Sequence, residues 1–216
     1  MGRRKSRYRE ALHGLGALLR SPESPVVIPP GMPATIEVGM GAGHVLVARA
    51  RAEPERTFVG FDIKEERVYQ AARVADAEKL ANIVFVAGEI ARSHTAIPSG
   101  RFDEILILFP DPWPKKRDVA RRLYSPRYLA IFERWMAPGA SGLLRSDNPA
   151  VFEAALASLA GAGCEVTSVC EDAEPWAIQT RYEAQFREQA LRIREIRFRW
   201  SSGAAVPALP AAALLP

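Results

Sequence analysis

Short apolar runs typical of β-strands alternate along this chain with longer segments of helical periodicity. The runs that predict strands are residues 34–39, 57–63, 82–88, 104–109 and 141–147. The segments that predict helices are residues 43–52, 64–80, 126–136 and 150–160. The first four strand runs are apolar on both faces, as in a parallel sheet that helices cover on both sides. The alternation therefore predicts a doubly wound α/β domain.

The C-terminal part of the chain has a different pattern. Residues 164–170 and 192–200 predict two more strands, and in the second Ile193, Ile196, Phe198 and Trp200 alternate with arginines. One exposed face is typical of an antiparallel strand, so we expect an antiparallel hairpin at the end of the domain. We assign residues 1–33 to a basic arm and lead-in, residues 34–200 to the folded domain, and residues 201–216, which are small residues and proline, to a disordered tail.

Composition excludes several classes of protein. The 216 residues suit one large domain, and no apolar run approaches the roughly 18 residues that span a bilayer. The polar N-terminus does not resemble a signal peptide, so we expect a cytoplasmic protein without a membrane partner. Two cysteines and three histidines lack ligand spacing, so we expect no metal. The net charge of +4 permits a polyanionic partner without requiring one.

A glycine-rich turn lies where the first predicted strand meets the first predicted helix. Gly39, Gly41 and Gly43 allow a sharp turn there and the close approach of a ligand. Asp62 follows about 20 residues later, the separation typical of an acid that binds a ribose. His44 stands where a dinucleotide-binding turn has its third glycine, which favours a nucleoside ligand without phosphates, such as S-adenosyl-L-methionine. By itself, the turn is equally typical of a tight strand-to-helix connection.

Acidic residues recur where the predicted strands end. Glu37, Asp62 and Glu89 belong to the first three strands or follow them directly. Open α/β sheets bind ligands at the carboxyl ends of their strands. A single solvated carboxylate at a strand end is unremarkable, but three in series favour a ligand site.

The stretch FPDPWPKKRDVARR, residues 109–122, follows the fourth predicted strand and brings a fourth acid, Asp111. The prolines on either side of Asp111 stiffen the loop, and Trp113 adds a flat apolar surface. A rigid acid, an aromatic ring and a basic rim suit a polyanion whose base is presented to a cofactor. The alternative is an ordinary solvated basic surface. The cations predicted to contact phosphates are Lys115, Lys116, Arg117, Arg121 and Arg122.

These motifs together resemble the tRNA (guanine-N7-)-methyltransferase family, a group of class I adenosylmethionine-dependent methyltransferases. FPDPWPKKR resembles the signature of the family and IEVGMGAGH, residues 36–44, resembles its cofactor loop. RSDN, residues 145–148, and TRYEAQF, residues 180–186, resemble its later substrate motifs. The resemblance covers roughly residues 34–200, and the PDPW and TxYE motifs are its specific part.

The resemblance implies a Rossmann-like sheet of seven strands whose last strand is antiparallel. It implies S-adenosyl-L-methionine as cofactor and tRNA as partner. The residues implied on the cofactor side are Glu37, Asp62, Glu89 and Asp111, and those implied to contact the substrate nucleotide are Lys115, Asp147, Thr180 and Glu183. The family more often has a histidine and a lysine where this chain has Asp118 and Ala120, a difference that bears on RNA affinity more than on cofactor binding.

The chemistry expected is alkylation of guanine N7, which carries a lone pair and no proton, so that alignment and electrostatics are the main catalytic needs. We expect Asp111 and Asp147 to act as catalytic charges and Glu183 to select guanine. Two other classes of function stay open at this point. One is a methyltransferase for another RNA, a protein or a small molecule, and the other is a catalytically silent RNA-binding relative. The sequence also leaves monomer and homodimer open.

Overall fold

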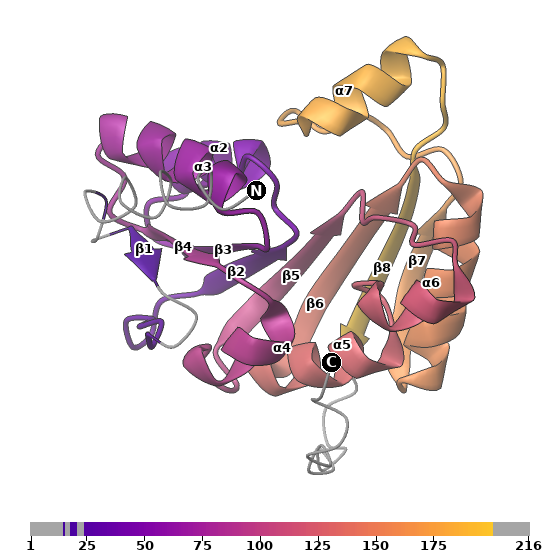
Figure 1. The fold of residues 1–216 in the computed structure, drawn as a ribbon, viewed down its shortest axis with the longest axis horizontal. Helices are drawn as coiled ribbons and strands as arrows, with labels where there is room; N and C mark the ends of the chain where they lie inside the picture. Colours follow the sequence, from indigo (N-terminus) through magenta and orange to yellow (C-terminus); the bar gives the residue numbers. More distant parts are fainter. Residues whose placement is uncertain (1–14, 16–17, 21–23, 201–216) are drawn as a thin grey trace. The chain divides into compact units, whose positions relative to one another are not determined.

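The computed structural model describes residue 15, residues 18–20 and residues 24–200 (Figure 1). The predicted tail, residues 201–216, and most of the predicted basic arm lie outside the described residues. The chain divides into two compact units, Met1–Pro98 and Ser99–Pro216, and each is described by itself.

The first unit contains a parallel sheet of four strands. The order is β1 (Leu19–Arg20), β4 (Ile83–Ala87), β3 (Thr57–Asp62) and β2 (Ala34–Val38). Helices α2 (His44–Ala52) and α3 (Glu65–Ala77) lie over one face of these strands (Figure 1), and the short α4 (Ile90–Ser93) and η1 (His94–Ala96) follow β4. Three of these strands and both long helices fall where the sequence predicts them.

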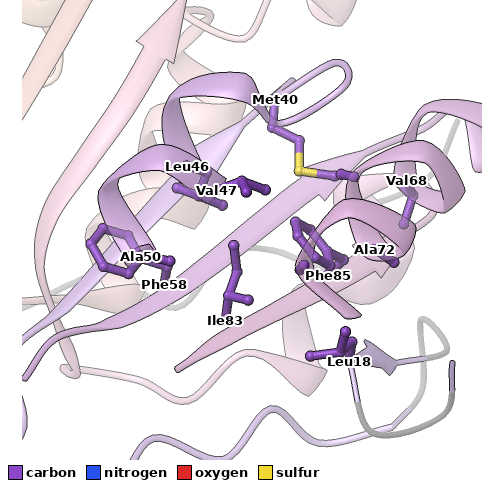
Figure 2. Close-up of a cluster of buried hydrophobic side chains, with 12 residues drawn as sticks. Leu18, Met40, Leu46, Val47, Ala50, Phe58, Val68, Ala72, Ile83 and Phe85 are labelled. Carbon is purple, nitrogen blue, oxygen red and sulfur yellow. The ribbon is translucent and has the colours of Figure 1, made fainter. Parts of the chain in front are cut away.

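A buried apolar cluster holds α2 and α3 on this sheet (Figure 2). Phe58 and Phe85 come from the strands, Leu46 comes from α2, and Met40 comes from the turn between β2 and α2. Gly60 in β3 makes room for Met40, because a Cβ at position 60 would lie 2.2 Å from the Met40 sulfur. Packing of the Met40 side chain in the core thereby fixes the position of the turn between β2 and α2.

The second unit contains a mixed sheet of four strands. The order is β5 (Phe102–Leu108), β6 (Met136–Ser146), β8 (Arg194–Trp200) and β7 (Cys164–Cys170). β5 and β6 are parallel, and β8 is antiparallel to both β6 and β7. The helical segments of this unit are η2 (Lys116–Arg121), α5 (Pro126–Trp135), α6 (Pro149–Gly161) and α7 (Arg181–Glu188).

The antiparallel last strand is confirmed, together with its alternation of buried and exposed residues. Ile196, Phe198 and Trp200 are buried, and the arginines between them, Arg197 and Arg199, are exposed. The β6 partner of Phe198 is a glycine, Gly142, and a Cβ there would lie 2.2 Å from the phenylalanine ring. The absence of a side chain at Gly142 therefore leaves room for the Phe198 ring to pack against the sheet.

The predicted number of strands was wrong by one. The described residues form eight strands, four in each unit, against the seven expected. The additional strand is β1, whose two residues pair with Phe85 and Val86 of β4. A strand of two residues is too short to leave a periodicity that the sequence could reveal. None of the helices in the described part of the chain is long and apolar enough to cross a membrane.

Candidate functional site

The glycine turn and Asp62 are joined by direct hydrogen bonds in the first unit. The backbone N–H of Gly41 donates to Oδ2 of Asp62, and that of Lys64 donates to Oδ1, each over 2.8 Å. Gly39, Gly41 and Gly43 all have positive φ, which a residue with a side chain rarely adopts. Gly43 also packs closely, because a Cβ there would lie 3.0 Å from that of Ala71 in α3.

Asp62 is the last residue of β3 and is almost completely buried. Burial raises the pKa of its carboxyl, and the two backbone hydrogen bonds and Arg67 oppose that shift. The carboxylate fixes the turn and still has lone pairs for a ligand hydroxyl. The acid predicted to bind a ribose therefore lies beside the glycines predicted to let that ligand approach.

Glu37 lies inside β2 and is only 3% exposed. Burial raises the pKa of its carboxyl to about 8, with Arg49 lowering it and Asp62 raising it further. Its Oε2 atom is buried and has no hydrogen-bond partner in the described part of the chain. A buried acceptor without a partner is costly, and it suits the donor of a bound ligand.

The remaining predicted cofactor residue of the first unit is Glu89, which is exposed and precedes α4 directly. His44, which replaces the third glycine of a dinucleotide-binding turn, is the exposed first residue of α2. Asp111, also predicted on the cofactor side, belongs to the second unit.

The loop after β5 holds Asp111 between two residues with unusual backbone. Phe109 has a φ of 50° and Trp113 a φ of 40°, in a region that residues other than glycine rarely occupy. Asp111 is exposed between its two prolines. A loop that keeps two such residues is held by its surroundings, and this supports the expectation that it is stiff.

The two arginines at the end of the basic run bind this loop. Arg122 donates to the carbonyl of Trp113 from Nε at 3.2 Å and from Nη2 at 3.0 Å. The guanidinium of Arg121 lies 5.2 Å from the centre of the Trp113 ring and 3.6 Å from Asp118. Their role as phosphate ligands stays a prediction, and both have an intramolecular role that was not predicted from the sequence.

The cations at the beginning of the run are more available to a polyanion. Lys115, Lys116 and Arg117 are exposed, and the guanidinium of Arg117 lies 3.8 Å from Asp118. Because an ion pair at the surface is weak, Arg117 keeps most of its capacity to bind a phosphate.

Asp147 is half-buried and directly follows β6. Burial raises the pKa of its carboxyl, whereas a hydrogen bond from its own backbone and the charge of Arg194 lower it. The next residue of the RSDN motif, Asn148, caps α6 by accepting from the N–H of Ala150 at 2.9 Å and of Val151 at 3.3 Å. The motif thus ends the strand, presents an acid and starts the helix.

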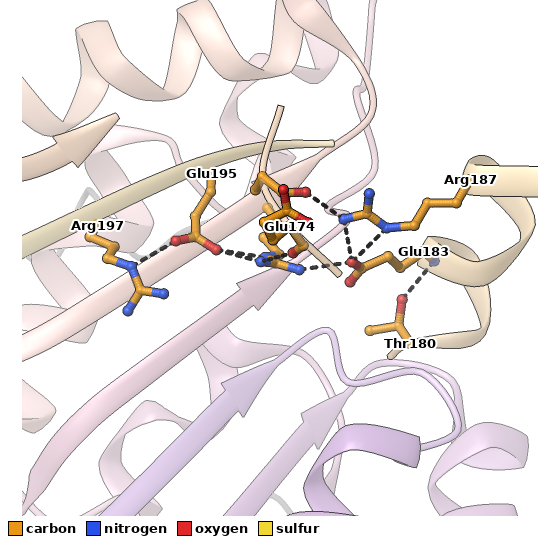
Figure 3. Close-up of polar contacts among 8 residues, drawn as sticks. Glu174, Thr180, Glu183, Arg187, Glu195 and Arg197 are labelled. Carbon is orange, nitrogen blue, oxygen red and sulfur yellow. Dashed lines mark hydrogen bonds and ion pairs between the residues drawn. The ribbon is translucent and has the colours of Figure 1, made fainter. Parts of the chain in front are cut away.

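Thr180 and Glu183, from the TRYE motif, form the beginning of α7. The Thr180 hydroxyl oxygen accepts from the N–H of Glu183 at 2.9 Å and caps the helix. The Glu183 side chain is fully buried, and its Oε1 accepts from Arg145 and Arg187, each over 2.8 Å (Figure 3). This network was not predicted from the sequence.

A signal for the network was nevertheless present. Arg145 directly follows Leu143 and Leu144 within a predicted strand, and an arginine buried there requires carboxylate partners. Glu195 interrupts the alternation of the last strand in the same way, and it is the second carboxylate of Arg145, over 2.7 Å. No group of three or more histidine, cysteine or acidic side chains suited to a metal occurs among the described residues.

Residues 32–196 match a family model described as "Putative methyltransferase". The tRNA (guanine-N(7)-)-methyltransferase of Levilactobacillus brevis is 31% identical over 166 residues, which are 74% of this chain and 77% of that protein. The enzyme of the same name from Limosilactobacillus fermentum is 36% identical over 127 residues, 59% of this chain and 59% of that protein.

Solved structures show the same fold at lower identity. The 16S rRNA methyltransferase KamB has a TM-score of 0.62 at 21% identity, over 78% of this chain and 88% of that chain. A SAM-dependent methyltransferase from Aquifex aeolicus has a TM-score of 0.56 at 17% identity, over 89% of this chain and 88% of that chain. The predicted methyltransferase fold is thereby confirmed.

Proposed function

Because the chain belongs to the tRNA (guanine-N(7)-)-methyltransferase family, we propose that it transfers a methyl group from S-adenosyl-L-methionine to N7 of a guanine in tRNA. The observation that carries this proposal is the 31% identity that extends over three quarters of this chain and of a relative named for that activity. The family's cofactor loop and its substrate motifs all lie within the matched residues 32–196.

The residues of the first unit fit the cofactor. Asp62 is suited to bind ribose hydroxyls, and Gly39 and Gly41 have no side chains to obstruct a nucleoside at the turn. The unpartnered Oε2 of Glu37 is suited to accept from an ammonium group. When bound, S-adenosyl-L-methionine supplies a sulfonium methyl group. Glu89 and Asp111 complete the proposed cofactor set, and no metal is required.

The acids of the second unit are proposed to act as fixed charges. Guanine becomes cationic as N7 gains the methyl group, and a carboxylate stabilises that positive charge. Asp111 is held in the stiff loop and Asp147 at the end of β6. Neither carboxylate has to take a proton from the substrate, because guanine N7 carries none. Their proposed contribution is therefore electrostatic.

The exposed cations of the second unit are proposed to bind the tRNA backbone. Lys115 and Arg117 are best suited, while Arg121 and Arg122 contribute as far as their contacts with the Trp113 loop allow. Glu183 and Thr180 are proposed to form the guanine site. We propose residues 34–200 as the catalytic domain and residues 1–33 as a basic arm that adds phosphate contacts. We also propose that the protein acts in the cytoplasm, as a monomer or homodimer.

The test is methyl transfer to total tRNA with deuterated-methyl S-adenosyl-L-methionine, followed by nucleoside mass spectrometry. We expect labelled 7-methylguanosine. Ribosomal RNA and a bulk protein fraction serve as parallel acceptors. Label in either of these and none in tRNA would assign the protein another acceptor, and label in none of the three would favour a silent relative.

A further inference from the structure

Arg145 is the residue at which the three substrate motifs of the second unit meet. Its backbone carbonyl accepts from the N–H of Phe109, the first residue of the FPDPW loop, at 2.8 Å. Its strand leads two residues later to Asp147. Its Nη1 donates to Oε1 of Glu183, in the TRYE motif, at 2.8 Å (Figure 3). One residue thus connects the loop and the strand end through its backbone and α7 through its side chain.

The guanidinium of Arg145 is buried and fully engaged. Nε donates to Glu195 at 2.7 Å, Nη2 donates to the carbonyl of Glu174 at 3.0 Å, and the Trp176 ring centre lies 4.1 Å from its central carbon. A planar fork with several donors makes these contacts at once, whereas a lysine ammonium presents one point charge. The geometry at Arg145 therefore requires arginine and not only a positive charge.

The two carboxylate oxygens of Glu183 have different environments. Oε1 accepts from Arg145 and, at 3.0 and 2.8 Å, from Nε and Nη2 of Arg187. Oε2 is buried and has no hydrogen-bond partner among the residues that the structure describes. A buried carboxylate oxygen in this state is costly unless a ligand supplies a donor. Guanine offers two neighbouring donors on one edge, N1–H and the 2-amino group.

We propose that Arg145 is a positioning residue for guanine selection. By holding Oε1 of Glu183, it leaves Oε2 as the acceptor for the N1–H and 2-amino donors of the target guanine. This inference rests on the proposed function, because it takes guanine in tRNA as the substrate.

Access to Oε2 requires a local movement, since the Glu183 side chain is fully buried. Residues 171–179 contain neither helix nor strand. Arg187 donates to the carbonyl of Ala173 at 2.7 Å, and Arg145 to that of Glu174, so this stretch is tied to the arginines that hold Glu183. We expect the stretch to shift when the base binds.

A purely structural ion pair would stabilise α7 without affecting the choice of base, and a pair of variants separates the two roles. Arg145→Lys keeps the charge but cannot hold Glu183, Glu195 and Glu174 together. Arg197→Lys is the matched control. Arg197 donates to Oε1 of Glu195 at 2.6 Å, in the same network, and has no contact with Glu183 in the described part of the chain.

The measurement is kcat and KM for a tRNA whose accepting guanosine, located first with the wild-type protein, is kept or replaced by inosine. Inosine keeps N7 and N1–H and lacks the 2-amino group. We expect the wild type to prefer guanosine over inosine. Arg145→Lys should lower the ratio of kcat/KM for guanosine to that for inosine at least about tenfold. Arg197→Lys should keep that ratio within about twofold of the wild-type value. The loss should appear in kcat/KM for guanosine, with S-adenosylhomocysteine affinity unchanged.

The outcomes separate this inference from the proposed function. A wild type that forms no 7-methylguanosine in tRNA would contradict the function itself. An active wild type whose Arg145→Lys variant keeps the wild-type ratio, or that does not discriminate against inosine, would overturn the role of Arg145. If Arg145→Lys does not fold, Arg187→Lys replaces it, because Arg187 holds the same Oε1 from a more exposed position. The same loss of selectivity is then expected, and an unchanged ratio would contradict the inference.

Discussion

The backbone N–H of Gly41 donates to Oδ2 of Asp62 over 2.8 Å, so the acid after β3 fixes the glycine turn after β2. The glycine turn and Asp62, the two sequence features that most suggest a nucleoside site, are therefore directly linked in the structure. A change at Asp62 acts on the ligand contact and on the shape of the turn together.

Asp62→Asn is expected to weaken S-adenosylhomocysteine binding by about 1.5–3 kcal/mol, because a charge-assisted contact is lost and the amide leaves Gly41 or Lys64 without an acceptor. Isothermal titration calorimetry measures the affinity. Asp76→Asn, which removes the same charge from the exposed side of α3, should bind like the wild type. Equal affinity in both variants and the wild type would mean that Asp62 does not contact the cofactor.

Glu37 is expected to make stability depend on pH. With a folded-state pKa of about 8 against an ordinary 4.5, the native protein holds a proton that the unfolded chain releases between these values. The free energy of unfolding therefore falls as pH rises from about 4.5 to 8 and is level above it. Relative to Glu37→Gln, the loss approaches about 5 kcal/mol as an upper value. Urea unfolding of both proteins from pH 5 to 8 tests this, and a constant difference would contradict it.

Cofactor binding should also release a proton from Glu37. An ammonium group near this carboxyl favours its charged form, so its pKa falls on binding. At pH 7, calorimetry of S-adenosylhomocysteine in phosphate and in Tris should give enthalpies that differ as expected for release of about one proton. Glu37→Gln should abolish the difference between buffers. A buffer dependence that survives in this variant would assign the proton to another group.

The basic run is expected to separate into two functions. Arg117→Ala, at an exposed position, should weaken tRNA binding and lower the salt slope by about one unit, with thermal stability unchanged. Arg122→Ala removes the two hydrogen bonds to the Trp113 carbonyl and should destabilise the protein by about 1–3 kcal/mol. Filter binding over a salt series and thermal unfolding measure these effects. An Arg122→Ala variant that keeps the wild-type stability and loses tRNA affinity would contradict this separation and assign Arg122 mainly to phosphate binding.

Methyl transfer should have no general-base limb in its pH dependence. Under single-turnover conditions with saturating cofactor and tRNA, the rate should be nearly level between about pH 6.5 and 9. Asp111→Asn and Asp147→Asn should each lower the rate and leave it level, because both act as charges. With chemistry shown to be limiting, a tenfold rise per pH unit would indicate an acceptor that must lose a proton.

The sequence predicted the parts of the fold whose periodicity is local. Strands such as β2 and β3 are rich in β-branched and aromatic residues and end at a glycine or an acid, so their bounds could be read to within a residue or two. Two other features could not be predicted in this way, because they depend on tertiary contacts. They are the pairing of β1 with Phe85 and the start of β6 at Met136.

The candidate site was foreseen as a set of residues and not as a set of contacts. The contact between Gly41 and Asp62 follows from two motifs at a known separation. The ion pair between Arg145 and Glu183 joins residues 38 apart in the sequence. Only the burial of charged groups indicated that pair, and the partner of a buried charge cannot be chosen without the fold.

The central claim is that N7 of guanine accepts the methyl group, and 7-deazaguanosine tests it most directly. This analogue replaces N7 by C–H and keeps the N1–H and 2-amino donors. A tRNA with 7-deazaguanosine at the accepting position should bind like the unmodified tRNA and gain no methyl group in single-turnover assays. Methyl transfer to that nucleotide at the rate found with guanosine would contradict the account.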